Sequence, residues 1–144
     1  MTNGKLSPRT ESAVLELLET AANLVQRYDR ALSFRGISYS EYRILSALSK
    51  TAPAGCPRID LAHAVGLTPS AVTRALKPLE KIGYVSNSRN KRDARQSLAT
   101  LSPAGVELLE DAQNVLNDLL KSLPFNLLAA EAVAEFKLRL LDLQ

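Results

Sequence analysis

The fold is decided by residues 59–85, which read IDLAHAVGLTPSAVTRALKPLEKIGYV. They predict two short helices joined by a tight turn. The first helix ends at Val65, because the Gly66 that follows is a residue favoured just beyond a helix end. Thr68 is a favoured N-cap and Pro69 fits the first helical position, so the second helix begins there. Two helices separated by a short turn that contains glycine are typical of a helix-turn-helix.

The residues after Gly83 predict a hairpin with a basic tip. Residues 84–88 and 96–101 can form two strands, the second of which alternates apolar with polar side chains. Residues 89–95 lie between them and carry five charged side chains. An antiparallel hairpin directly after a helix-turn-helix predicts a winged helix.

Before the helix-turn-helix, the sequence predicts two helices and a linker. Residues 1–8 show no periodicity, so no regular structure is expected there. An apolar stripe with steps of three and four begins at about Thr10 and ends at Gly36, which predicts a long helix. Ser40 is expected to cap a second, shorter helix. Residues 51–57 contain two prolines and a glycine and predict a linker.

After the hairpin, the sequence predicts two leucine-rich helices. Ser102 followed by proline repeats the cap of the earlier helix, and Pro124 is expected to separate the two helices. The predicted fold class is mainly α with a small β-wing. It comprises a winged helix-turn-helix domain over residues 40–101 and a helical region at each chain end, over residues 1–39 and 102–144.

The composition bounds the class of protein. A chain of 144 residues with 46% hydrophobic and 23% charged residues suits one domain with a buried core. We expect no transmembrane helix, because no run of about 18 uncharged apolar residues occurs. The start of the chain has no apolar segment typical of a secretory signal, so we expect a soluble, cytoplasmic protein. One cysteine and one histidine make a poor zinc site, and we expect no metal and no cofactor.

Charge is distributed unevenly along the chain. Residues 40–101 carry ten Lys/Arg and four Asp/Glu, a net charge of +6. The segment before them has a net charge of +1, and the segment after them has a net charge of −4. A basic middle indicates a surface that faces a polyanion. Chance clustering on a solvated surface is the alternative.

The second helix of the helix-turn-helix is predicted to enter the DNA major groove, which an α-helix fits. Its side opposite Val72, Leu76 and Leu79 is polar, and arginines at the hairpin tip suit a narrow minor groove. Asp93 is expected to orient a neighbouring arginine by a charge-assisted bond. Pro78 is expected to bend the helix. The predicted DNA-binding residues are Thr68, Ser70, Thr73, Arg74 and Lys77 in the helix, with Arg89, Lys91, Arg92, Asp93 and Arg95 in the tip.

About forty residues resemble the MarR family of transcriptional regulators. The resemblance lies in four stretches: residues 65–74, residues 79–85, Arg92-Asp-Ala-Arg95, and residues 101–105. The Asp-x-Arg pair is that family's wing signature. The sequence departs from the family at Pro78, at Ala94, where a second arginine is frequent, and at the tip. The tip lacks the usual proline, so Asn90 is expected to make the turn.

The resemblance implies a homodimer that binds a pseudo-palindromic site in double-stranded DNA. Helices from both chain ends would interlock in the dimer, which makes residues 1–39 and 102–144 its dimerisation regions. The resemblance also implies a response to a small aromatic or phenolic effector, in a cavity where those helices meet the winged helix. The candidate ligand-binding residues are Phe34, Arg35, Tyr39, Tyr42 and Arg43. Alternatively, the tyrosines belong to the core and the arginines to the surface.

The predicted function is a sequence-specific, ligand-modulated DNA-binding transcriptional regulator that acts as a repressor, with an activator as the alternative. We expect no enzyme, because the sequence has no phosphate-binding glycine loop, no Ser/His/Asp set and no paired carboxylates in a cleft-like context. One alternative is a winged-helix module that binds protein. Another is a regulator that senses oxidants through Cys56, although a passive role suits a cysteine in this loop better. His63 is expected to be structural or to contact a phosphate.

Overall fold

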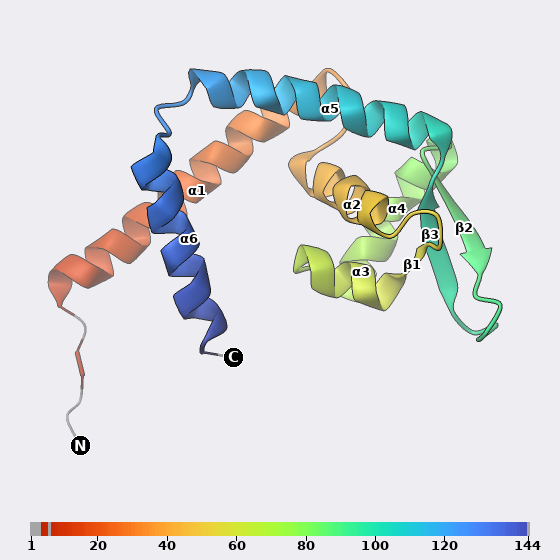
Figure 1. Ribbon diagram of the computed structural model, residues 1–144, viewed down its shortest axis with the longest axis horizontal. Helices are drawn as coiled ribbons and strands as arrows, with labels where there is room; N and C mark the ends of the chain where they lie inside the picture. Colours follow the sequence, from red (N-terminus) through yellow and green to blue (C-terminus); the bar gives the residue numbers. More distant parts are fainter. Residues whose placement is uncertain (1–3, 6, 144) are drawn as a thin grey trace.

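A winged helix-turn-helix carried between long helices is the architecture of the computed structural model, which describes residues 4–5 and 7–143 (Figure 1). The predicted fold class, mainly α with a small β-wing, is confirmed. In chain order the elements are α1 (Pro8–Ser33), α2 (Tyr39–Lys50), β1 (Cys56–Pro57), α3 (Arg58–Val65), α4 (Pro69–Ile82), β2 (Val85–Arg89), β3 (Ser97–Leu101), α5 (Pro103–Ser122) and α6 (Leu127–Leu141).

Three helices begin with the same local signal, a hydroxyl side chain followed by proline. The hydroxyl oxygens of Ser7, Thr68 and Ser102 each accept a hydrogen bond, at 3.1 to 3.2 Å, from the backbone N–H three residues later. The proline that follows loses nothing, because the N–H at that position has no partner inside the helix. The expectation of irregular structure over residues 1–8 is therefore wrong at Pro8, while residues 1–3 and 6 lie outside the described residues.

The cap of α2 is Ser38, not Ser40. The Ser38 hydroxyl accepts from the Glu41 backbone N–H at 3.1 Å and donates to the Glu41 carboxylate at 3.3 Å. This arrangement resembles a capping box, in which an acidic residue three positions on supports the capping serine. Ser40 lies inside the helix and is exposed.

The predicted linker over residues 51–57 ends in a third strand. In β1, Cys56 pairs with Ala99 and Pro57 with Leu98, so the antiparallel sheet has the order β1-β3-β2. A glycine is needed just before it: Gly55 has φ +87°, and a Cβ there would lie 2.8 Å from the Cγ2 of Thr100. The two residues of β1 are too few to show an alternating strand pattern, and one of them is proline. Their pairing depends on residues about forty positions away, so local sequence does not predict it.

The core lies where α5 and the end of α1 pack on the winged unit. It joins Leu32 of α1 and the buried face of α5 to apolar side chains of α2, α3, α4 and the sheet. The largest fully buried side chains, each less than 2% exposed, are Leu32, Ile44, Leu45, Leu48, Leu61, Leu76, Leu79, Val65 and Val72.

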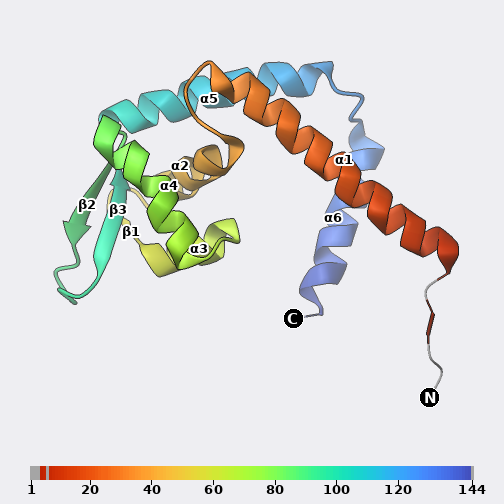
Figure 2. The ribbon, with the colours of Figure 1, turned by 180° about the vertical axis from the view of Figure 1, so that it is seen from behind.

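The two chain ends project away from this core (Figure 2). Most of α1 is exposed, and every described side chain of α6 is exposed except that of the half-buried Ala129. Many of these side chains are large and apolar, Leu18 and Leu128 among them, at 60% and 74% exposed. The described helices include none that combines the length and apolarity needed to cross a membrane.

Candidate nucleic-acid interface

Helix α4 separates an apolar face from a polar one. Val72, Leu76 and Leu79 are at most 1% exposed and pack in the core. Thr68, which caps the helix, is exposed together with the four predicted contact residues on the opposite side: Ser70, Thr73, Arg74 and Lys77. Ser70, Thr73, Arg74 and Lys77 therefore share one accessible face of α4, and Thr68 is accessible at the start of the helix.

The helix continues through Pro78 to Ile82. Proline has no N–H to donate to the Arg74 carbonyl, so one bond of the helix is missing there. Ser70, Thr73 and Arg74 precede that position and lie in the first turns. The bend predicted at Pro78 stays a prediction.

The hairpin tip is shaped by two side chains that bond to the local backbone. Asn90 Oδ1 accepts from the Arg92 N–H at 3.0 Å, so the expectation that Asn90 makes the turn is confirmed. Asp93 Oδ1 accepts from the Arg95 N–H, also at 3.0 Å. Asp93 therefore bonds a neighbouring arginine as expected, but at the backbone N–H of Arg95 and not at a guanidinium, so that the carboxylate closes a turn.

The tip cations remain available to an outside anion. Arg89 ends β2, and Lys91, Arg92 and Arg95 are exposed. Within the described part of the chain, none of these four forms an ion pair with a carboxylate. Because like charges repel, a basic tip of this kind is stabilised when a polyanion approaches.

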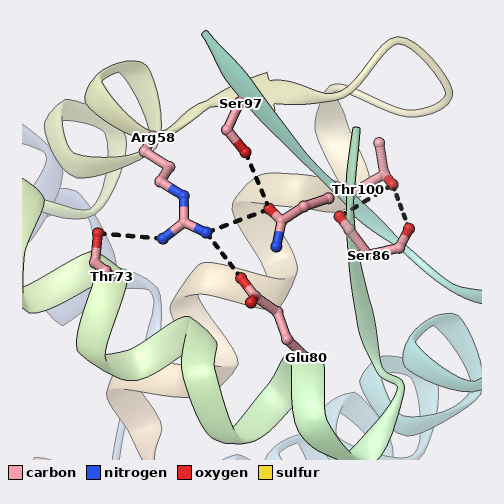
Figure 3. A network of polar contacts seen from close by, with 7 residues as sticks. Arg58, Thr73, Glu80, Ser86, Ser97 and Thr100 are labelled. Atoms are coloured by element: carbon pink, nitrogen blue, oxygen red, sulfur yellow. Dashed lines mark hydrogen bonds and ion pairs between the residues drawn. The ribbon is translucent and has the colours of Figure 1, made fainter. Parts of the chain in front are cut away.

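A network that sequence reasoning missed connects α4 to the wing (Figure 3). The guanidinium of Arg58, the first residue of α3, donates to Thr73 and Glu80 of α4 and to Asn87 of β2. Thr73 and Glu80 are seven positions apart and share a face of α4. The sequence spacing indicates that Thr73 and Glu80 lie on one face, but it does not indicate that Arg58 binds both of them.

The five candidate ligand-binding residues do not line one cavity. Phe34 is 86% exposed. Arg35 pairs with the Asp111 carboxylate of α5, and this hydrogen bond holds the pKa of Asp111 below its ordinary value. The Tyr39 ring lies edge-on to that of Tyr28, with centroids 5.2 Å apart, and is partly buried in the core margin.

Tyr42 and Arg43 do line a cavity, of about 390 Å³, between α2 and α3. Its other lining residues include Ser46, Lys50 and Thr51, so two cationic and three hydroxyl side chains line it. Burial raises the pKa of the Tyr42 phenol above its ordinary value. The arrangement suits a small anion with an apolar part.

A larger cavity of about 690 Å³ lies between α1 and the connection from α5 to α6. It is lined by Leu24 and Arg27 on one side and by residues 122–125 on the other. In the described ranges 4–5 and 7–143, no group of three or more His, Cys, Asp or Glu side chains could hold a metal ion.

Cys56 is a buried edge-strand residue. It is 5% exposed, and its burial, assisted by the charge of Asp60, raises the pKa of the thiol. A sensor thiol needs the opposite, an accessible sulfur with a lowered pKa. His63 is exposed on α3.

The model of the MarR family matches residues 37–97. YwhA of Bacillus subtilis, an uncharacterized HTH-type transcriptional regulator, is 35% identical over 72 residues, covering 47% of this chain and 52% of YwhA. The HTH-type transcriptional regulator SarZ of Staphylococcus epidermidis is 29% identical over 103 residues, covering 72% of this chain and 66% of SarZ. The chain thus spans about half to two thirds of these curated relatives.

Solved structures share the fold at low sequence identity. The Staphylococcus aureus MepR–DNA complex has a TM-score of 0.77 at 18% identity and covers 97% of this chain and 100% of the MepR chain. Bordetella bronchiseptica BpsR, whose DNA binding is regulated by 6-hydroxynicotinic acid, has a TM-score of 0.78 at 20% identity, with coverages of 90% and 93%.

The buried state of Cys56 predicts slow thiol chemistry. At pH 8 the raised pKa leaves less thiolate than in a free cysteine, and burial restricts access. Iodoacetamide should therefore alkylate the native protein at least about tenfold more slowly than the urea-unfolded protein, as followed by mass spectrometry. Equal rates would restore the oxidant-sensing alternative.

Proposed function

Because the model of the MarR family matches residues 37–97, we propose that the chain is a MarR-family regulator, a sequence-specific, double-stranded-DNA-binding protein that acts as a repressor. The observation that carries the proposal is the pairing of two cationic surfaces on one winged unit. One is the polar face of α4, and the other is the wing tip without ion-pair partners among the described residues. Family membership and curated relatives agree with a regulator rather than an enzyme.

In this proposal α4 enters the major groove by its N-terminal turns. Arg74 can bind the O6 and N7 atoms of guanine with both arms of its guanidinium, and Ser70 and Thr73 can bond a base edge or a phosphate. The wing tip would lie over the adjacent minor groove, where Arg92 and Arg95 meet a strong negative potential. MepR, which shares the fold, has been solved bound to DNA.

The proposal includes a homodimer built from the two chain ends. More large apolar side chains are exposed on α1 and α6 than the isolated ones that are usual on the surface of a monomer. A second copy of the chain would cover them. The exposed large apolar residues of these two helices are Val14, Leu15, Leu17, Leu18, Val25, Leu128, Val133, Phe136, Leu138, Leu140 and Leu141. Residues 1–39 and 102–144 would then form the dimerisation regions and residues 40–101 the DNA-binding domain.

A small aromatic acid is the proposed effector. The cavity beside Tyr42 and Arg43 offers cations for a carboxylate and an apolar wall for a ring. Arg35 is a weaker candidate than Arg43, because Asp111 already occupies it. The DNA binding of BpsR is regulated by an aromatic acid of this kind.

A protein-binding winged helix is the second candidate function. An exposed basic face suits an acidic protein as well as DNA, but a protein partner would not require cations on both α4 and the wing tip. The first experiment below separates the two candidates.

Loss of Arg74 and Arg95 together should strongly weaken specific DNA binding. Each arginine that reads a base contributes about 1–3 kcal/mol, so Arg74→Ala with Arg95→Ala should weaken binding by roughly 30-fold or more. The probe is a duplex that the wild-type protein selects from a random-sequence library, and affinity is measured by fluorescence anisotropy between 50 and 200 mM salt.

Lys121→Ala is the matched control, because it removes a cation at the far end of α5. It should leave both the affinity and the salt slope unchanged. An unchanged salt slope and affinity in the double arginine variant would overturn the assignment of these contacts. If the wild-type protein selects no duplex, the DNA-binding function itself fails.

Disruption of α6 should break the dimer. In sedimentation experiments the wild-type chain should be a dimer, whereas Phe136→Asp should be a monomer, because a carboxylate cannot be buried in an apolar interface. Deletion of residues 124–144 should give a monomer or an aggregate. Lys137→Gln, on the same helix, should remain a dimer. A well-folded dimer from the truncated chain would refute the proposed interlocking of chain ends.

The effector proposal predicts ligand-dependent stabilisation. Salicylate or 6-hydroxynicotinate, at about 100 times its dissociation constant, should stabilise the folded state by about 2.7 kcal/mol, which raises the melting temperature by several degrees. Arg43→Gln should abolish the shift, and Arg35→Gln should retain it. A melting temperature that responds to neither acid would exclude this class of effector at the site.

A further inference from the structure

Arg58 stands between the recognition helix and the wing. It is the first residue of α3 and directly follows β1, and its side chain is 26% exposed. Figure 3 shows its guanidinium reaching toward Thr73 and Glu80, which lie on α4. The Arg58 side chain therefore reaches from α3 to α4, the helix that is proposed to read DNA.

The guanidinium makes three hydrogen bonds. Nη1 donates to Thr73 Oγ1 at 3.2 Å, and Nη2 donates to Glu80 Oε1 at 3.0 Å and to Asn87 Oδ1 at 3.4 Å. Asn87 Oδ1 also accepts from the Ser97 hydroxyl at 3.5 Å, which extends the network to β3. Within the described part of the chain, no other side chain hydrogen-bonds to both α4 and the hairpin of β2 and β3.

The charge of Arg58 is compensated inside the protein. Its ion pair with Glu80 is largely buried, since the side chains of Arg58 and Glu80 are each 26% exposed. A cation that is already paired with a carboxylate is less free to neutralise a DNA phosphate, and so to release the counterions condensed on the DNA, than the tip cations are. Its position and its partners indicate a structural use of the guanidinium rather than a direct phosphate contact.

The bond to Thr73 affects how that hydroxyl can bind. A threonine hydroxyl has one donor hydrogen and two acceptor lone pairs. Here Arg58 occupies one lone pair, and its positive charge polarises the O–H bond, which strengthens Thr73 as a donor and weakens it as an acceptor. The group that Thr73 contacts should therefore be an acceptor, such as a phosphate oxygen, guanine O6 or N7, adenine N7 or thymine O4.

We propose that Arg58 is a positioning residue for DNA recognition: it fixes the wing against α4 and sets the Thr73 hydroxyl as a hydrogen-bond donor. This rests on the proposed DNA-binding function. The planar fork of arginine is needed, because its donors point to three partners at once, whereas a lysine ammonium on a flexible chain cannot hold the same geometry. Charge alone does not replace it.

The first test uses the free protein and no DNA. Arg58→Met and Arg58→Lys should both increase amide hydrogen exchange in β2 and β3 by roughly tenfold, while exchange in α1 stays unchanged. Lys81→Met, which removes an exposed cation from α4 without touching the network, should leave the wing unchanged. Wing exchange at the wild-type rate in both Arg58 variants would overturn the positioning role.

The second test is a double-mutant cycle on a duplex that the wild-type protein selects from a random library. Arg58→Met and Thr73→Val should each lower the affinity about threefold to tenfold, the effect of one net hydrogen bond. The double variant should lose little more than the Arg58 variant, because Thr73 is no longer set as a donor. The dependence of affinity on salt should stay at the wild-type slope.

Three results would overturn the proposal in this second test. Additive losses would show that Arg58 does not act through Thr73. Full affinity in Arg58→Lys would show that charge alone suffices. A salt slope reduced by about 1 would make Arg58 a direct phosphate contact. Failure of the wild-type protein to select any duplex defeats the DNA-binding function instead, and wing exchange in the free protein still decides the mechanical role of Arg58.

Discussion

The buried apolar face of α4 fixes the rotation of this helix about its own axis, and the proposed interface depends on that orientation. Val72, Leu76 and Leu79 are at most 1% exposed, and burial of each such side chain contributes about 1.5–3 kcal/mol. A turn of one residue about the helix axis would remove that face from the core and bring charged side chains toward it. Arg74 is therefore held outward by the leucines and valine behind it.

The wing obtains its charge in a different way. Its tip gathers four cations, and Asn90 and Asp93 close backbone turns between them. Asp93 keeps its negative charge while it accepts the Arg95 N–H, so residues 89–95 retain a net charge of +3 that a bound polyanion would balance. Arg58 differs, because its partner Glu80 lies on the neighbouring helix. In the proposed function, therefore, Arg58 holds two parts of the protein together, whereas the tip arginines contact DNA.

Local signals in the sequence identify most of the helices, and long-range contacts account for what was missed. Thr68 with Pro69 and Ser102 with its proline were found because a cap acts within three residues. Ser7 with Pro8 carries the same signal and was overlooked. The strand at Cys56 and the network of Arg58 could not be found this way, since they join residues 15 to 43 positions apart. For the same reason, the sequence does not show that Arg35 is separated from the other candidate ligand-binding residues: its ion-pair partner, Asp111 of α5, is distant in sequence.

In the proposed dimer, α5 is the element that would transmit geometry between the two chain copies and the DNA. Its buried face joins the core through Leu109, Ala112 and Leu116, and Leu32 brings the end of α1 into the same core. Arg35 adds an ion pair between the end of α1 and α5. Two recognition helices must lie about 34–36 Å apart to meet successive major grooves. Since α5 and the end of α1 share one core with α4, and are not joined to it through a flexible linker, that spacing would be set by packing. A ligand bound beside α2 would therefore alter DNA affinity only if it shifts this packing.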